Sequence, residues 1–484
     1  MQTVDGTIYA QPLYAHHVNI PGLGVHNVVY VATENDSLYA FDADINQPAL
    51  WQRSLIPPGE AVVSVSDVSG CDNIAPVIGI TSTPVIDCST YTMYVVAKTK
   101  RVQGPSTTFH QRLYALDITT GADRVAPVEI LGSVPGTGTP SDGHGHVVFN
   151  PQWHLNRPGL LLLNGVVYVG FGSHCDFHLA PPSPRYQGWV FGFDALTLVP
   201  TGVFGACPDA PINPDGRAGA GIWQAGMGLA ADAAGFVYCT TGNGDLTANL
   251  PGGRNYGDTV LKLRNNLTVA DFFTPFDQPT LLQQDIDLGS GGVLILPDPP
   301  VGTGLLPLLT NCGKDGKIFL INCNNMGHYN GPGGPDLVVQ TVELQPGRPI
   351  TDQPGVWGGP AYYRTANQQL LYYCGNGSHL RAYLFSGSAL TFFAQSPNAF
   401  PREGGVTPNV SSNQQAVGTG VVWAITRSNP LHLQAFDASN VANQLFDAPC
   451  GPWHNDNGGP FIEPTTIQGK VYVPSDGELT VFGL

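Results

Sequence analysis

The stretch that decides the fold is Val28-Val29-Tyr30-Val31-Ala32, followed after a short polar segment by Leu38-Tyr39-Ala40-Phe41-Asp42. β-Branched and aromatic residues at this density are typical of strands that are packed on both faces. The closing Asp42 predicts a turn, because its carboxylate accepts local backbone N–H groups. The stretch therefore predicts two adjacent strands of a layered β-structure.

The same two elements recur along the chain. Strands like the first element are predicted at 93–97, 166–170, 236–240, 370–373, 421–424 and 471–474. Strands like the second are predicted at 113–117, 190–194, 260–263 and 433–437. Repetition of this kind is the signature of a repeat architecture.

Each repeat opens with a strand start that is rich in small residues or Pro. The eight openings are residues 10–14, 82–86, 157–161, 225–229, 290–294, 358–362, 407–411 and 463–467. Small residues fit there because the innermost strands of a propeller converge on its axis. We therefore predict an all-β fold: an eight-bladed β-propeller with four-stranded antiparallel blades, forming one domain over residues 1–484. A β-solenoid and two packed sandwiches are the alternatives. Solenoid periods are shorter, however, and sandwiches do not repeat the same strand opening eight times.

Composition agrees with many short strands joined by tight turns. The chain holds 60 Gly and 42 Pro, and 42% of its residues are apolar. Only 12% are charged, and the net charge is −16. The excess of acidic over basic residues argues against nucleic acid and anionic membranes as partners. No apolar stretch is long enough to span a membrane.

The last repeat is expected to lack a strand. After Glu463 the chain has room for about three strands, and only Met1 to Asp5 precede the first blade. Either upstream residues supply the fourth strand, or the last blade has an open edge. An open edge invites self-association by strand pairing. Because Met1-Gln2-Thr3 lacks the features of a signal peptide, we expect any such peptide to have been removed.

Nine cysteines suggest disulfides and an exported protein. The expected pairs are Cys71 with Cys88, Cys175 with Cys207, and Cys312 with Cys323. Cys239 and Cys450 are the candidates for the thiol that an odd number leaves unpaired. Buried free thiols are the alternative. With disulfides, the predicted location is secreted, extracellular or periplasmic.

Several stretches resemble a known repeat. Residues 28–42, 79–85 and 93–117 resemble the pyrroloquinoline-quinone-like propeller superfamily, which includes quinoprotein alcohol dehydrogenases and a propeller lipoprotein of outer-membrane assembly. Residues 164–175, 221–244 and 313–317 are similar to secreted bacterial proteins described as quinoprotein-like. The resemblance covers essentially the whole chain and implies the fold more strongly than an activity.

The candidate site is one mouth of the central channel. Its candidate residues, extrapolated from the repeat, are Gln11, Thr83, Arg157, Trp223, Gln224, Lys314, Asp315, Trp357 and Glu463. In a quinone-dependent enzyme, Trp223 or Trp357 would stack on the cofactor, and Asp315 or Glu463 would act as base or ligand. The loops at 241–245 and 455–459 carry oxygen ligands suited to calcium, although turn formation explains them equally well.

The leading interpretation is a binding or structural module without an evident catalytic site. Its partner would be a small molecule, a glycan or a protein, and assembly through the open edge is a further possibility. The alternative is a pyrroloquinoline-quinone-dependent oxidoreductase acting on an alcohol or sugar. Known enzymes of that class stack the quinone on a disulfide between adjacent cysteines, and this sequence has no Cys-Cys pair. That absence favours the binding module.

Overall fold

The computed structural model describes residues 1–484 apart from 139–140, 176–185, 211–218, 401–403, 456–461 and 484. The predicted all-β class is confirmed. The described residues contain a single α-helix, α1 (Gln278–Gln284), and 3-10 turns η1 (Val65–Val68), η2 (Gln224–Gly226), η3 (Leu288–Ser290) and η4 (Ile350–Asp352). None of these helices is long and apolar enough to cross a membrane.

Antiparallel sheets of four or more strands follow one another along the chain, and we number them in that order. The first holds β2 (Leu13–Ile20), β3 (Gly24–Ala32), β4 (Ser37–Asp42) and β5 (Trp51–Ser54). The second holds β8 (Val85–Asp87), β9 (Thr92–Gln103), β10 (Ser106–Asp117) and β11 (Asp123–Glu129), extended by β6 (Ala61–Ser64) and β7 (Val77–Ile78). The third holds β15 (Leu161–Leu163), β16 (Val166–Ser173), β17 (Trp189–Asp194) and β18 (Pro200–Gly205), with β14 (His154–Leu155) beside β16. The fourth holds β19 (Ala230–Ala231), β20 (Val237–Thr240), β21 (Val260–Leu263) and β22 (Val269–Phe273).

Four more sheets complete the arrangement. The fifth holds β23 (Val293–Ile295), β24 (Leu308–Cys312), β25 (Lys317–Asn322) and β26 (Gln340–Glu343). The sixth holds β27 (Ala361–Arg364), β28 (Gln369–Tyr373), β29 (His379–Phe385) and β30 (Leu390–Ala399). The seventh holds β31 (Asn409–Ser411), β32 (Val421–Thr426), β33 (His432–Asp437) and β34 (Gln444–Pro449). The eighth holds β35 (Thr465–Ile467), β36 (Lys470–Pro474), β37 (Asp476–Gly483) and β1 (Gln2–Thr7). A separate hairpin pairs β12 (Ser133–Pro135) with β13 (His146–Val148).

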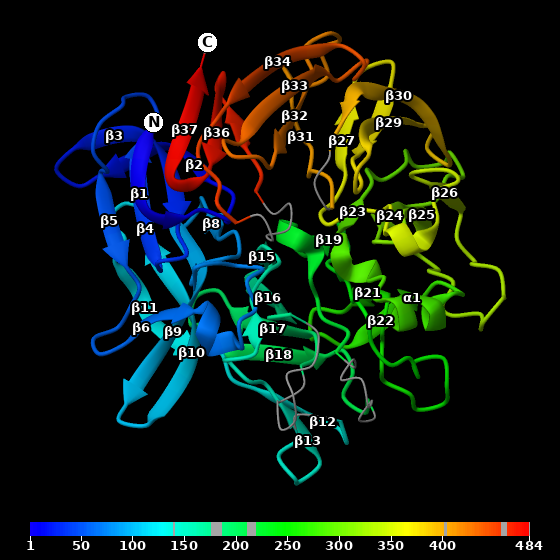
Figure 1. Ribbon diagram of the computed structural model, residues 1–484, viewed down its shortest axis with the longest axis horizontal. Helices are drawn as coiled ribbons and strands as arrows, with labels where there is room; N and C mark the ends of the chain where they lie inside the picture. Colours follow the sequence, from blue (N-terminus) through cyan, green and yellow to red (C-terminus); the bar gives the residue numbers. More distant parts are fainter. Residues whose placement is uncertain (139–140, 176–185, 211–218, 401–403, 456–461, 484) are drawn as a thin grey trace.

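The expectation that the last sheet lacks a strand is wrong. β1 pairs antiparallel with β37, with Gln2 opposite Leu479, and supplies the fourth strand (Figure 1). The residues before the first opening are enough to form this fourth strand, because β1 extends to Thr7. The prediction had counted only the residues up to Asp5. The open edge on which self-association was predicted is therefore paired.

The strand openings surround one axis, as Figure 1 shows for the sheets as a whole. Each opening contacts the next. The contacts are Gln11 N to Thr83 Oγ1 (2.9 Å), Leu160 N to Thr83 O (3.0 Å), Gly159 N to Met227 O (3.2 Å), Met227 against Gly292, Gly292 N to Gly358 O (2.9 Å), Gly358 against Thr407, Thr466 Oγ1 to Asn409 Oδ1 (3.1 Å), and Gln11 Nε2 to Pro464 O (3.1 Å). The predicted openings therefore lie next to one another around this axis.

A buried tyrosine repeatedly joins one sheet to the next. It lies in the second strand of a sheet, and its hydroxyl donates to a backbone carbonyl just beyond the third strand of the following sheet. The pairs are Tyr30 with Ile118 O (3.0 Å), Tyr94 with Ala195 O (2.8 Å), Tyr168 with Asn265 O (3.0 Å), Tyr372 with Ala438 O (2.5 Å) and Tyr472 with Ala43 O (3.1 Å). Because the surrounding interfaces are apolar, each hydroxyl needs such a partner. We call these bonds the tyrosine pins.

Candidate functional site

A cavity of about 270 Å³ lies where the openings of the first four sheets and the eighth meet. We call it the axial cavity. It is lined by Gln11, Thr83, Gly159, Leu160, Gly226, Met227, Gly228 and Glu463. At one wall the backbones of two glycines pack closely, since a Cβ on Gly159 would lie 3.3 Å from the Cα of Gly228. Three of the predicted site residues, Gln11, Thr83 and Glu463, are thus brought together.

Glu463 gives the axial cavity its chemical character. Within the described residues its carboxylate has no hydrogen bond and no ion pair. Desolvation raises the pKa of Glu463 to about 8, because burial penalises the charged form. Gln11 already donates its backbone N–H to Thr83 Oγ1 and its side-chain amide to Pro464 O. The cavity therefore presents a carboxylate that lacks a cationic partner.

Met227, which also lines the axial cavity, packs against the fifth and sixth openings. A Cβ on Gly292 would lie 2.7 Å from Met227 Sδ, and one on Gly359 would lie 1.5 Å from it. The thioether can occupy this space only because both positions are glycine. The fifth and sixth openings consequently contribute no lining residue to the axial cavity.

Four other predicted residues form two pairs that do not line the axial cavity. The Arg157 guanidinium carbon lies 5.7 Å from the centre of the Trp223 ring, and Lys314 Nζ lies 5.7 Å from the centre of the Trp357 ring. These are cation–π distances. Lys314 Nζ also lies 2.7 Å from an Asp287 carboxylate oxygen. Each pair is therefore engaged within itself, and none of the four residues lines the axial cavity.

The Trp223 indole is held between glycines. A Cβ would lie 2.6 Å from its ring at Gly172, 2.7 Å at Gly221 and 2.7 Å at Gly242. Backbone therefore packs directly against the indole, whose Nε1 has no hydrogen-bond partner in the described structure. Little room remains beside Trp223 for a stacked cofactor.

Gln224 and Asp315 lie away from the cavity and have local partners. Gln224 donates to Gly228 O (2.9 Å) and accepts from Thr240 N (3.0 Å). Asp315 accepts from Lys317 N at 3.1 Å, and burial raises its pKa to about 7. Both side chains hold loops in place in this structure.

The predicted disulfide pairs are wrong. Cys71 and Cys175 are bonded to each other, with a Cα–Cα distance of 5.8 Å. Cys88, Cys207, Cys312 and Cys323 are free, as are Cys239 and Cys450, the two candidates for the unpaired thiol. Cys88 is exposed, whereas the other free thiols are buried. The disulfide ties the segment after η1 to the loop that follows β16, so the pairing depends on contacts between two sheets.

The loops proposed for calcium provide no clear site. In the first, Asn243 Nδ2 donates to Asp285 (2.7 Å) and Asp245 accepts from Asn255 (2.6 Å). In the second, residues 456–459 lie outside the described residues. Across the described part of the chain, no group of three or more His, Cys, Asp or Glu is arranged to hold a metal ion.

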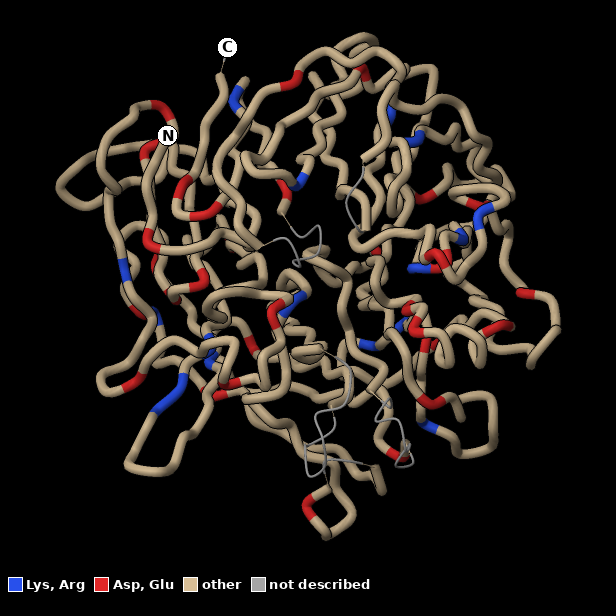
Figure 2. Tube along the Cα trace, viewed as in Figure 1, with Lys and Arg blue, Asp and Glu red and all other residues tan. Residues whose placement is uncertain are grey.

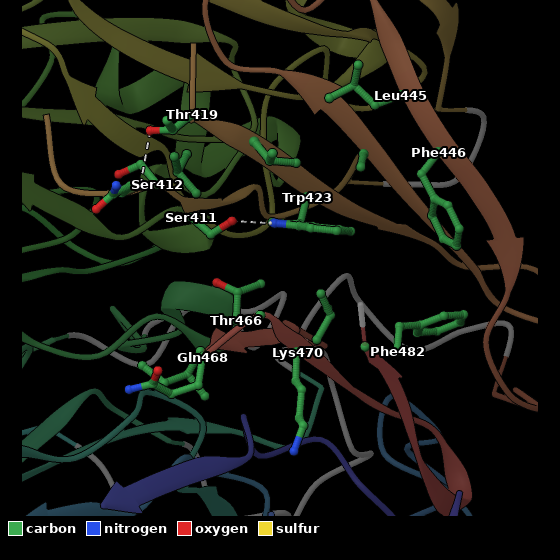
Figure 3. Close-up of a pocket in the computed structure, with 18 residues that line it drawn as sticks. Ser411, Ser412, Thr419, Trp423, Leu445, Phe446, Thr466, Gln468, Lys470 and Phe482 are labelled. Carbon is green, nitrogen blue, oxygen red and sulfur yellow. Dashed lines mark hydrogen bonds between the residues drawn. The ribbon is translucent and has the colours of Figure 1, made fainter. Parts of the chain in front are cut away.

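A second, larger pocket of about 900 Å³ lies between the seventh and eighth sheets (Figure 3). We call it the seam groove. One wall carries Trp423, Leu445 and Phe446, and the other carries Phe482 and the β35–β36 turn. Sequence reasoning missed this groove. The available signal was Trp423, which stands where most other repeats have the tyrosine of a pin.

Comparisons with known proteins identify the fold. No protein-family model and no curated protein matches the chain. The chain is similar in structure to a quinohemoprotein alcohol dehydrogenase from Comamonas testosteroni, with a TM-score of 0.61 and 14% identity over 99% of this chain and 75% of that one. A quinohemoprotein alcohol dehydrogenase from Pseudomonas putida HK5 gives a TM-score of 0.54 and 13% identity over 98% and 70%. The chain thus has the β-propeller fold of these quinoproteins, as its sequence suggested.

Proposed function

We propose that this protein is an exported, eight-bladed propeller that binds a small organic cation in its axial cavity. The observation that carries the proposal is the Glu463 carboxylate, which faces the cavity without a partner among the described residues. A cationic ligand with N–H groups would supply that partner, and charge-assisted hydrogen bonds to a carboxylate are strong.

The blade count and the location rest on separate observations. Eight blades are supported by the eight sheets of four or more strands and by the closed series of contacts between their openings. Export is supported by the Cys71–Cys175 disulfide, because disulfides persist in oxidising compartments.

Size and charge limit the ligand. At about 30 Å³ per molecule, the axial cavity has room for about nine waters, so the ligand is small. The net charge of −16 attracts cations from solution. Figure 2 shows Lys and Arg scattered among the sheets and interspersed with Asp and Glu. Because Glu463 is the one charged residue that lines the axial cavity, a cation fits this cavity better than an anion does.

The oxidoreductase alternative is supported by the fold but fits the residues poorly. Pyrroloquinoline quinone is a flat tricarboxylate that is used with a bound cation, so it needs positive groups and metal ligands around it. The axial cavity has no Lys or Arg among its lining residues and presents a carboxylate instead. Backbone glycines contact the Trp223 ring, and the disulfide of the described chain joins distant cysteines. We therefore derive no catalytic step.

Calorimetric titration with methylguanidinium chloride tests the proposal. This ion stays charged over the whole working range, so any pH dependence belongs to the protein. We expect saturable binding at about pH 9 and a loss of at least about tenfold in affinity for Glu463→Gln. Glu343→Gln, an exposed glutamate of β26, is the matched control and should bind as the wild type does.

Three results would overturn the proposal. The first is the absence of saturable binding to the wild-type protein, and the second is equal binding by Glu463→Gln. The third is alcohol-dependent reduction of a dye after pyrroloquinoline quinone and calcium are added, which would establish the oxidoreductase instead.

A further inference from the structure

The seam groove lies at the interface where the tyrosine pin is replaced. In the seventh sheet the pin position is Trp423, which has no hydroxyl. Its Nε1 donates to Ser411 Oγ (2.9 Å) within the same sheet, so it makes no bond to the eighth sheet (Figure 3). The five pin tyrosines are at most 2% exposed, whereas Trp423 is only partly buried.

Buried apolar side chains fill part of this interface. Leu433 of the seventh sheet shares a buried apolar cluster with Val471 and Val473 of the eighth. Farther out, Leu445 is 57% exposed and Phe446 is 38% exposed, and the Phe446 and Phe482 rings meet edge to face at 5.6 Å. Large apolar side chains that line an open groove are typical of a ligand site.

The groove has an apolar end and a polar end. Figure 3 shows Leu445, Phe446 and Phe482 at one end, Ser412, Thr419 and Gln468 at the other, and Trp423 between them. The charges of the lining residues indicate whether the polar group of a ligand would be neutral or anionic. Lys470 is the one charged lining residue, and its Nζ already bonds to Ala43 O and Asp44. The polar end therefore favours a neutral, hydroxyl-bearing group over an anion.

We propose that the seam groove binds a neutral amphiphile, with its apolar chain against Trp423, Phe446 and Phe482 and its hydroxylated head at Ser412, Thr419 and Gln468. The ligand occupies the open space beside Trp423, and its apolar part covers exposed aromatic surface. A volume of about 900 Å³ suits a molecule of this kind. The site is separate from the axial cavity and does not depend on its function.

Octyl glucoside, kept below its micelle concentration, is the probe. We expect saturable binding by calorimetry, accompanied by a change in tryptophan fluorescence that Trp423→Phe removes. Leu445→Arg should weaken binding by at least about tenfold, because it places a charge in the apolar end. Leu337→Arg is the matched control, since Leu337 is also 57% exposed and lies outside the groove. It should bind as the wild type does.

Three outcomes would overturn this assignment. They are the absence of saturable binding to the wild type, an equal loss in Leu337→Arg, and equally tight binding of octyl sulfate, which has the same chain and an anionic head. Glu463→Gln should leave octyl glucoside binding unchanged. A loss of binding at the seam groove is thereby distinguished from a loss of binding at the axial cavity.

Discussion

Tyr472 donates its hydroxyl to the carbonyl of Ala43 at 3.1 Å, across 429 positions of sequence. This bond joins the eighth sheet to the first, beside the β1–β37 pairing that contributes the N-terminal strand to the eighth sheet. The ring is therefore closed by the same tyrosine pin that joins other neighbouring sheets, together with one exchanged strand.

Tyr472→Phe should lower the free energy of unfolding by about 1 kcal/mol, the usual net value of a neutral hydrogen bond. The loss is modest because Lys470 also donates to the Ala43 carbonyl and keeps it satisfied. Urea denaturation measures the change. Tyr91→Phe, at an exposed position, is the control and should have no effect. Equal midpoints for wild type and Tyr472→Phe would contradict a role of the pin in closure.

Cys175→Ser should lower stability by about 2–4 kcal/mol, because the disulfide closes a long loop in the unfolded chain. Its two cysteines are 104 residues apart. Cys88→Ser removes an exposed free thiol and should change nothing. Non-reducing peptide mapping should yield one linked peptide pair that contains Cys71 and Cys175. Recovery of a Cys71–Cys88 pair would show that the observed pairing is wrong.

Gly172→Ala should lower stability by about 1–3 kcal/mol, the usual range for overpacking a core. The new Cβ would lie 2.6 Å from the Trp223 ring, which the other glycines prevent from moving. At Gly228 the nearest atom to a new Cβ is 3.5 Å away, so Gly228→Ala serves as the control. Thermal denaturation distinguishes the two variants, and similar midpoints would exclude tight packing around Trp223.

Glu463→Gln should remove a pH dependence of stability. The folded protein keeps a proton on Glu463 up to about pH 8, whereas the unfolded chain releases it near the ordinary pKa of 4.5. Between these values the folded state binds more protons, so this group lowers the free energy of unfolding as pH rises. The stability of Glu463→Gln relative to wild type should therefore increase from about pH 5 to about pH 9.

Glu343→Gln provides the reference for that measurement, because Glu343 is exposed. Its stability relative to wild type should not change over the same pH range. A constant difference for Glu463→Gln as well would mean that the Glu463 carboxyl is not desolvated.

Much of the fold was predictable because strands are encoded locally. The segment 28–32 lies within β3, 113–117 within β10 and 433–437 within β33. Alternation and β-branched content act over a few residues, so they are visible in one sequence. The openings were equally visible, since crowding at the axis demands small residues wherever a repeat begins.

The sites were predictable only in part. Repeat register placed Gln11, Thr83 and Glu463 at one cavity, but it also selected Asp315, which instead bonds to Lys317. Register gives a position along a strand, whereas the direction of a side chain depends on its neighbours in the next sheet. The seam groove escaped prediction for the same reason.

The sequence by itself determined the strands, their repetition and the small residues at the axis, because these follow from local chemistry. Tertiary structure alone decided that β1 completes the eighth sheet, that Cys71 pairs with Cys175, and that Trp423 borders an open groove. Each of these depends on which distant segments the closed ring brings together, and no short-range pattern carries that information.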